Sequence, residues 1–387
     1  MKIVAHFIRK NSQLRSSFIQ NQILNHINYK PVIIHRYNSK KDDGGFAEFQ
    51  RNDIPILDLS INKKLDLNFR YLKKISKKDV LRVIDFLDKQ NVSILHFHYG
   101  SDAYIYTDIM KFAQRPSVVS FYGYDASKFY KRFFGYASSL LKIVFSCASA
   151  ILAMSEEMKK DLIKIGCPED KIIVHYHGIP TKYFADLKHN YNKILDDFVL
   201  LNVAYFDKVK GHIFILKALE LLINKGYINI KLKLVGNGPY ENRIKKYVKK
   251  KKLDKYVIFL GPMKYLSDNF LLQFKNADLF IHPSITTRND KEGIPGTIVE
   301  AMATGLPIIS TYHGGIPYII DNKKSGLLVE EWDILGLANS IITLINNKEL
   351  REELGQNAKK YALENLDLLQ KEKELETIYN NLLNISD

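Results

Sequence analysis

The stretch from Glu292 to Gly315, EGIPGTIVEAMATGLPIISTYHGG, constrains the fold more than any other part of the chain. Its apolar residues recur about one turn apart, so the spacing predicts a helix that begins near Gly296 or Thr297. Gly305 and Pro307 end that helix, and the apolar run that follows is typical of a buried strand. A helix that leads directly into a buried strand indicates an α/β protein with a parallel sheet.

Two carboxylates flank the predicted helix start: Glu292 in the loop, and Glu300 eight residues later in the helix. The free amides of residues 296–298 would point out of the helix N-terminus, where unpaired N–H groups and the helix dipole favour an anion. A phosphate on these amides, with a hydroxyl bound by each carboxylate, has the layout of a nucleotide-sugar. The alternative is a solvated loop followed by a surface glutamate. The ligand-site hypothesis requires that Glu300 and the helix start stay accessible.

Length and cysteine content set the broad class. A chain of 387 residues suggests two domains on a prior of about 150 residues per domain. The two cysteines, Cys147 and Cys167, have no metal-ligand spacing, which indicates a reducing compartment. The first ten residues begin as a strand and show no signal peptide. We therefore expect a cytoplasmic protein.

The positive charge is concentrated in the first half of the chain. Of a net charge of +15, residues 1–190 carry +12 and residues 191–387 carry +3. A basic half favours an anionic partner, such as a membrane surface, a phosphorylated acceptor or nucleic acid. The alternative is a generally lysine-rich composition, and the charge alone does not separate the two.

The first half alternates between predicted strands and helices, which indicates βαβ units and a parallel sheet. The predicted strands cover residues 3–8, 31–37, 93–99, 117–122, 150–154 and 171–177. The predicted helices cover residues 16–27, 78–90, 103–112, 133–146 and 156–165. Residues 38–53 are expected to form a loop.

Residues 133–154 contain one charge and could span a bilayer by length alone. We prefer a buried helix followed by a strand, because Lys142 near the middle and four serines weaken a membrane span. The preceding segment 128–134, KFYKRFF, has the basic and aromatic character of a membrane interface, although an exposed helix turn has the same composition.

A second series of strands and helices follows a predicted linker over residues 179–197. Its predicted strands cover residues 199–206, 230–235, 257–260, 279–282 and 307–312. Its predicted helices include residues 211–225, 240–252, 334–346, 348–364 and 366–383. The last of these is long and apolar on one face, so it should pack on another element.

Two turns of the second half are candidates for phosphate contact. Gly236 and Gly238 lie between a strand and a helix, but Glu241 replaces the third glycine of a dinucleotide fingerprint, which disfavours NAD. Lys208 and Lys210 follow the strand 199–206, in the crevice where doubly wound sheets bind ligands.

Taken together, these motifs resemble the nucleotide-binding half of the retaining glycosyltransferases of family four, which have two Rossmann-like domains (the GT-B fold). The matching segments are 203–211, 234–239, 257–263, 277–284, 292–310, 314–320 and 325–329. The first half matches more weakly, through segments 16–23, 94–103, 118–127 and 150–166. The resemblance is greatest to transferases that build bacterial exopolysaccharide, lipopolysaccharide or capsule.

For the second half, the resemblance implies a nucleoside-diphosphate-sugar donor and no metal or other cofactor. Glu300 would bind the ribose hydroxyls, Glu292 a sugar hydroxyl, and Lys210 the departing diphosphate. Tyr205 stands where the family usually has an arginine, and Lys208 would replace that cation. The remaining donor-binding residues would be Gly236, Gly238, Gly293, Ile294, Pro295, Gly296 and Thr297.

For the first half, the resemblance implies an acceptor side. The family often has a His-Gly turn where this chain has Tyr122-Gly123, with Asp125 close by. His98 matches another family histidine and would contact the acceptor or the leaving group, whereas His96 is better explained as a core residue. Retention without an evident protein nucleophile suggests front-side attack, in which the departing phosphate oxygen takes the acceptor proton.

We therefore expect a two-domain GT-B glycosyltransferase, with the domains facing across a cleft. Residues 1–190 would bind a glycan or lipid-linked acceptor at the inner face of the plasma membrane, residues 197–365 the donor, and residues 366–387 would return to the first domain. The alternatives are a GT-B phosphorylase, a nucleotide-sugar epimerase, or a non-catalytic protein that binds nucleotide-sugars or nucleic acid. No nucleic-acid recognition motif is present, which argues against the last of these.

Overall fold

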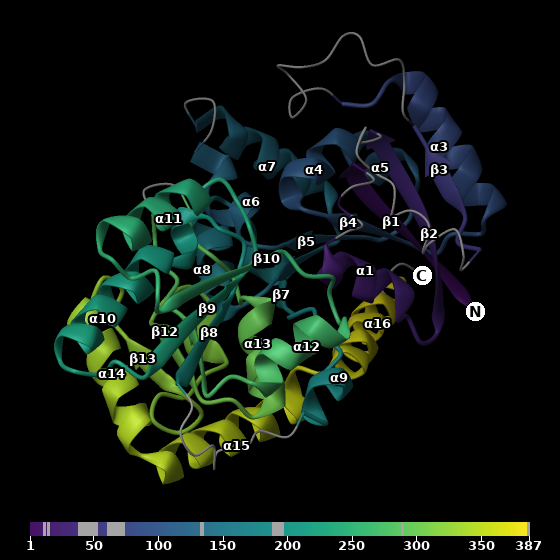
Figure 1. Cartoon of the computed structure of the whole chain (residues 1–387). Helices are drawn as coiled ribbons and strands as arrows, with labels where there is room; N and C mark the ends of the chain where they lie inside the picture. Colours follow the sequence, from purple (N-terminus) through teal and green to yellow (C-terminus); the bar gives the residue numbers. More distant parts are fainter. Residues whose placement is uncertain are drawn as a thin grey trace. The chain divides into compact units, whose positions relative to one another are not determined.

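The computed structural model describes residues 1–10, 13, 16–37, 53–59, 74–131, 135–187, 197–287 and 290–384. The chain forms two compact units (Figure 1). The first combines Met1–Gly178 with Leu368–Asp387, and the second is Ile179–Asp367. Each unit contains a parallel sheet with helices, so the predicted α/β class is confirmed. Most of the expected loop 38–53, part of the expected linker and the end of the segment 128–134 lie outside the described residues.

The sheet of the first unit has seven parallel strands in the order β3-β2-β1-β4-β5-β6-β7. The strands are β1 (Lys2–Lys10), β2 (Tyr29–Tyr37), β3 (Ile56–Asp58), β4 (Ile94–His98), β5 (Ser117–Phe121), β6 (Ala150–Ala153) and β7 (Ile172–Val174). Strands β4, β5 and β6 are buried along their whole length, which explains why they are almost continuously apolar.

Helices join these strands and cover the sheet. They are α1 (Ser17–Leu24), α3 (Lys77–Lys89), α4 (Gly100–Ala103), α5 (Thr107–Phe112), α6 (Tyr124–Ser127), α7 (Tyr136–Cys147), α8 (Glu156–Lys164) and α16 (Leu368–Asn384). Leu375 and Tyr379 of α16 pack on Val4, Ile94 and other side chains of the sheet. The last helix of the chain therefore completes the core of the first unit.

The sheet of the second unit has six parallel strands in the order β10-β9-β8-β11-β12-β13. The strands are β8 (Phe198–Val203), β9 (Ile230–Val235), β10 (Val257–Gly261), β11 (Leu279–His282), β12 (Ile308–Thr311) and β13 (Leu327–Val329). The helices are α9 (Lys182–Ala185), α10 (His212–Asn224), α11 (Glu241–Lys250), α12 (Asp268–Lys275), α13 (Gly296–Thr304), α14 (Ile334–Asn346) and α15 (Lys348–Asn365).

Several element boundaries differ from the sequence prediction. The single helix expected over 103–112 is divided into α4, a 3-10 turn at Tyr104–Tyr106, and α5. The short strands β3 and β13 and the helix α12 were not predicted. Residues 179–187 belong to the second unit rather than to a linker, because Ile179 pairs with Asp367 and Phe184 packs on Phe274.

The described residues of the apolar run 133–154 contain the helix α7 and the strand β6, as preferred over a membrane span. Among the described residues, no helix combines the length and the apolar character that a bilayer crossing requires.

Candidate functional site

The candidate site of the second unit lies where the strand order reverses, between the neighbouring strands β8 and β11. Ligands of doubly wound sheets bind beyond the carboxyl ends of the strands at such a switch point. Lys210 closes the 3-10 turn Lys208–Lys210 after β8, and Ser284 and Glu292 follow β11. The topology therefore brings together two segments that are about 80 residues apart in sequence.

Glu292 is the centre of a charged group. Its carboxylate forms an ion pair with Nζ of Lys210 and accepts a hydrogen bond from Oγ of Ser284. Nε2 of His282 lies 3.7 Å from the same carboxylate. Burial alone would raise the pKa of Glu292, but Lys210 and His282 outweigh it and hold the pKa well below the ordinary value. Glu292 is therefore an anion, available as a hydrogen-bond acceptor.

Gly211 lets the Lys210 turn approach β11. Its φ is +69°, and a Cβ atom built there would lie 1.8 Å from the carbonyl oxygen of Pro283. The amide of Ile285 also donates to the carbonyl oxygen of Val209 at 2.8 Å. Only glycine fits this contact, which fixes Lys210 beside the residues that follow β11.

The backbone of Glu292 is held by a histidine. Its N–H donates to Nε2 of His313 at 3.0 Å, and Nδ1 of His313 lies 2.7 Å from Oε1 of Glu331. Nδ1 must therefore carry the hydrogen, and Glu331 fixes that tautomer. Sequence reasoning missed Ser284, His282, His313 and Glu331. The HGG triplet after the predicted strand 307–312 was the signal that could have indicated His313.

The start of α13 presents open backbone amides. The N–H groups of Gly293, Ile294, Gly296 and Thr297 have no acceptor among the described residues. No heavy atom lies within 4 Å of a Cβ atom built at Gly296. Pro295, the N-cap residue, has no N–H to offer. The unpaired amides of Gly296 and Thr297 lie at the helix N-terminus, and those of Gly293 and Ile294 come just before the N-cap residue and just after Glu292, the partner of Lys210. Such donors favour an anion.

Glu300 differs from the expectation. The ligand-site hypothesis requires an accessible carboxyl group, but the residue is only 4% exposed, so this condition is not met for Glu300. Within the described part of the chain, one of its carboxyl oxygens has no hydrogen-bond partner. Burial raises the pKa of Glu300 to about 8, and a hydrogen bond from Tyr265 opposes this rise. The carboxyl group therefore lies inside the unit with unused hydrogen-bonding capacity, which is the costly arrangement for a buried polar group.

The other predicted donor-binding residues form neighbouring turns. Gly236 and Gly238 follow β9 and pack on the backbone of Ala204 and Phe206. The amide of Phe206 donates to the carbonyl oxygen of Asn237 at 2.8 Å. Tyr205 is 58% exposed, and Lys208 is exposed too. Tyr205 and Lys208 lie in the segment that leads to Lys210, but within the described residues neither side chain forms a hydrogen bond or an ion pair with Glu292.

The three predicted residues of the first unit also lie at the carboxyl ends of strands. His98 ends β4 and is fully buried, with Nδ1 bonded to the Tyr122 hydroxyl at 2.7 Å and Nε2 bonded to His6 at 2.9 Å. Burial, with His26 nearby, lowers the pKa of His98 to about 3, so the ring is neutral. Both ring nitrogens of the buried His98 are thus bonded to neighbours within the described residues.

The carboxylate of Asp125 binds the backbone around Tyr122. It accepts from the amides of Gly100, Tyr122 and Gly123 at 2.8, 3.0 and 3.2 Å. Burial raises the pKa of Asp125 to about 6, although these amides lower it. The carboxylate therefore holds the Tyr122-Gly123 turn to the start of α4. His96 is a buried core residue bonded to Tyr379 and Ser120.

Two protein-family models match consecutive parts of the chain. The glycosyltransferase family 4 model matches residues 46–183, and the glycosyl transferases group 1 model matches residues 184–361. The capsular polysaccharide biosynthesis glycosyltransferase CapM of Staphylococcus aureus is 30% identical over 260 residues, which are 64% of this chain and 65% of CapM.

Other curated relatives differ in product. N-acetyl-alpha-D-glucosaminyl L-malate synthase of Bacillus anthracis is 26% identical over 78% of either chain. The amylovoran biosynthesis glycosyltransferase AmsK of Erwinia amylovora is 29% identical over 66% of this chain and 61% of AmsK. The match thus spans between about three fifths and four fifths of these relatives' lengths.

Solved structures share the fold. Anabaena HepE, solved with UDP, has a TM-score of 0.77 and 17% identity, with 98% of this chain and 100% of HepE covered. A glycosyltransferase of Rickettsia africae has a TM-score of 0.76 and 20% identity, with 99% and 98% covered. The GT-B architecture expected from the sequence is confirmed.

Proposed function

Because this chain belongs to the glycosyltransferases of group 1 and family 4, we propose that it transfers a sugar from a nucleoside-diphosphate donor to a glycan or lipid-linked acceptor in the synthesis of a cell-surface polysaccharide. The observation that carries this proposal is the Lys210–Glu292 pair beside four open amides at the start of α13. Cation, amide donors and carboxylate acceptor match a diphosphate joined to a sugar.

Each residue has a defined role in the proposed reaction. The amides of Gly293, Ile294, Gly296 and Thr297 bind the distal phosphate, and Lys210 neutralises the diphosphate as it departs. Glu292, ionised by its own neighbours, accepts a hydrogen bond from a donor-sugar hydroxyl. Glu300 binds the ribose through its unpaired oxygen, which requires that the ribose reach a carboxyl group that is 4% exposed. Charge that develops on the leaving group is thus stabilised by groups already in place.

We propose a retaining reaction by front-side attack that requires no metal. The oxygen of the departing phosphate takes the acceptor proton while the new glycosidic bond forms, so the proton balance needs no further base. Lys210 and the helix start supply the positive charge that a divalent cation supplies in other phosphate sites. Activity should therefore survive exhaustive chelation, and a strict requirement for an added divalent cation would contradict this part of the proposal.

The donor is best sought among UDP-sugars, because HepE has been solved with UDP and UDP-glucose. A thermal-shift panel of UDP, GDP and ADP, run beside an oligonucleotide, identifies the base, since a ligand that binds the folded state raises the melting temperature by mass action. A shift with the oligonucleotide alone would favour the nucleic-acid-binding alternative.

The decisive experiment compares Lys210→Ala and Glu292→Ala with Lys245→Ala. Lys245 is a half-exposed lysine of α11 that pairs with Glu241 one turn away, so it is a matched control for the loss of a paired charge. Removing either site residue should lower sugar transfer on the order of a hundredfold. The control should retain wild-type transfer. If both site variants stay within about twofold of wild type, the proposed site is wrong.

A further inference from the structure

A buried series of polar side chains links the last helix to Tyr122. Nδ1 of His98 lies 2.7 Å from the Tyr122 hydroxyl, and Nε2 of His98 lies 2.9 Å from Nδ1 of His6. Nε2 of His6 lies 2.8 Å from Nε2 of His26, whose Nδ1 lies 2.6 Å from Oε1 of Glu372 on α16. Three imidazoles therefore connect a tyrosine at one end to a carboxyl group at the other.

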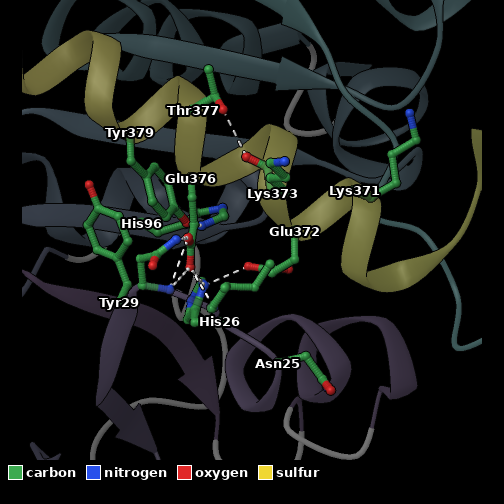
Figure 2. A network of polar contacts seen from close by, with 12 residues as sticks. Asn25, His26, Tyr29, His96, Lys371, Glu372, Lys373, Glu376, Thr377 and Tyr379 are labelled. Atoms are coloured by element: carbon green, nitrogen blue, oxygen red, sulfur yellow. Dashed lines mark hydrogen bonds and ion pairs between the residues drawn. The ribbon is translucent and has the colours of Figure 1, made fainter. Parts of the chain in front are cut away.

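The members of this relay come from separate elements that share one face of the sheet. His6 lies on β1 opposite His96 of β4, and His98 is two residues further along β4. His26 follows α1, and Figure 2 shows it beside Glu372 and Glu376 of α16. The side chains of His26 and Glu372 are each 1% exposed. Solvent therefore does not interrupt the series between these two residues.

Hydrogen counting gives the relay two states. Each of the three hydrogen bonds from Tyr122 to His26 needs one hydrogen, because two such atoms cannot face each other at these distances without one. The 2.6 Å contact between His26 and Glu372 is an ion-pair contact whose geometry is not that of a good hydrogen bond, and its length still requires a proton between the two groups. Burial lowers the pKa of His6 and of His98, so both rings are neutral and carry one hydrogen each. The direction of every contact is then set by the number of protons that His26 and Glu372 share.

When His26 and Glu372 share one proton, every hydrogen bond of the relay is donated in the direction that runs from Tyr122 to Glu372. Tyr122 then donates to His98, His98 donates from Nε2 to His6, and His6 donates from Nε2 to His26. When the pair holds two protons, the order reverses. His98 then carries its hydrogen on Nδ1 and donates to the Tyr122 oxygen, and the hydroxyl hydrogen of Tyr122 is released for another acceptor.

We propose that Glu372 and His26 are positioning residues for Tyr122: through His6 and His98, the protons that they share decide whether the Tyr122 hydroxyl accepts or donates a hydrogen bond toward a hydroxyl-bearing ligand. Tyr122 follows β5 directly, at the carboxyl edge where parallel sheets bind ligands. The activity arm of the test below rests on the proposed transferase function, whereas the spectroscopic arm does not.

The surroundings of the pair restrict where its protons can go. Glu376 lies 3.8 Å from Nδ1 of His26, but its carboxylate oxygens already accept hydrogen bonds from the amides of Ile27 and Asn28 and from the Asn28 side chain. Burial raises the pKa of Glu372, and the neighbouring His26 opposes this rise. The other titratable groups that face the relay are Tyr29, His96, Tyr99, Asp125, His175 and Tyr379.

A metal ion is the competing explanation for part of this cluster. The nearest ring nitrogens of His6, His96 and His98 all lie within 4.8 Å of one another. However, every ring nitrogen of these three residues already has a hydrogen-bond partner, and the rings of His96 and His98 stack at 4.6 Å. Hydrogen bonds thus account for all six nitrogens, and the geometry favours the relay over a metal site.

The test is a pH titration of the full chain labelled with 15N-histidine, because ring-nitrogen shifts distinguish N–H from bare nitrogen. Between about pH 9 and about pH 5, His98 should change from the Nε2–H to the Nδ1–H tautomer while it stays neutral. The midpoint should equal that of the His26 signals. A fixed His98 tautomer, double protonation of His98, or stoichiometric metal in the purified protein would overturn the proposal.

The variant Glu372→Gln, compared with Glu374→Gln, tests the origin of the change. Loss of the Glu372 charge should move the His98 tautomer change to lower pH, whereas Glu374, which pairs with Lys371 near the surface, should have no effect. A role of Glu372 in fold stability alone would leave the tautomer midpoint unchanged. If Glu372→Gln does not fold, the titration of the wild-type protein still shows whether the His98 tautomer changes with pH.

The activity arm measures the pH profile of sugar transfer. Glu372→Gln should change the acceptor KM and its pH dependence, while UDP binding in the second unit stays as in the wild type. An unchanged acceptor KM profile in an active variant counts against the proposal. A wild-type chain without transferase activity would refute the proposed function instead, and would leave the tautomer result standing.

Discussion

At the scale of single residues, Glu292 and Glu300 show how the surroundings of two identical side chains shift their pKa values in opposite directions. Glu292 has a lysine, a serine hydroxyl and a histidine around its carboxylate, and is ionised. Glu300 has one unpartnered oxygen in a buried position, and its pKa is raised to about 8. The first is ready to bind a ligand, and the second gains its missing partners only when a ligand supplies them.

The raised pKa of Glu300 predicts how stability depends on pH. Between its unfolded pKa and about 8, the folded chain holds one more proton than the unfolded chain, so stability falls as pH rises through this window. Glu300→Gln removes the penalty, and should stabilise the protein at about pH 8.5 by on the order of 5 kcal/mol, which corresponds to the rise of the pKa from 4.5 to about 8. Urea unfolding at several pH values measures this, with the exposed Glu349→Gln as control. Parallel pH curves for wild type and Glu300→Gln would contradict the raised pKa.

The same residue predicts the pH dependence of nucleotide binding. Ribose hydroxyls donate to the ionised carboxylate, so the affinity for UDP should increase from about pH 6 to about pH 8 in the wild type. Glu300→Gln should bind UDP more weakly and without this increase. Calorimetric titration at the two pH values measures both effects. A similar pH dependence in the variant would show that Glu300 does not contact the ribose.

At the scale of elements, the sequence predicted the helix α13 and its start, because glycine, proline and apolar spacing are local signals. It did not predict that Glu300 would be buried, although all residues from Ile298 to Thr304 are apolar or small apart from Glu300, so this helix has no solvent face. Ser284 and Glu331 could not be predicted as partners of this segment, because their contacts depend on which strand ends become neighbours. For His313 the HGG triplet indicates a candidate residue, but not its contact with Glu292.

The close approach of the Lys210 turn to β11 predicts the cost of a methyl group. Gly211→Ala places Cβ against the Pro283 carbonyl, whereas Gly226→Ala, at φ +93°, meets no heavy atom within 4 Å. The control carries only the cost of a left-handed backbone, about 1 kcal/mol. Gly211→Ala should cost at least about 2 kcal/mol more, because backbone must move. Equilibrium unfolding measures the difference, and equal losses for the two variants would mean that the contact is not tight.

At the scale of the whole molecule, the strongest asymmetry is electrostatic, since residues 1–190 carry +12 of the net charge. We expect this half to bind a membrane surface that contains anionic lipid, and this binding should weaken as salt rises. Co-sedimentation with vesicles that contain phosphatidylglycerol measures it, with purely zwitterionic vesicles as control. Binding that ignores both lipid charge and salt would point to apolar insertion instead.

The return of α16 to the first sheet has a consequence for biosynthesis. The ribosome makes Met1–Gly178 first. It makes α16, which packs on the sheet of that unit, only after the entire second unit. Until then the nascent chain exposes an imidazole-rich surface with nothing to cover it. A premature stop codon shortly before Leu368 would therefore damage the half that was translated earliest, and leave the later half intact.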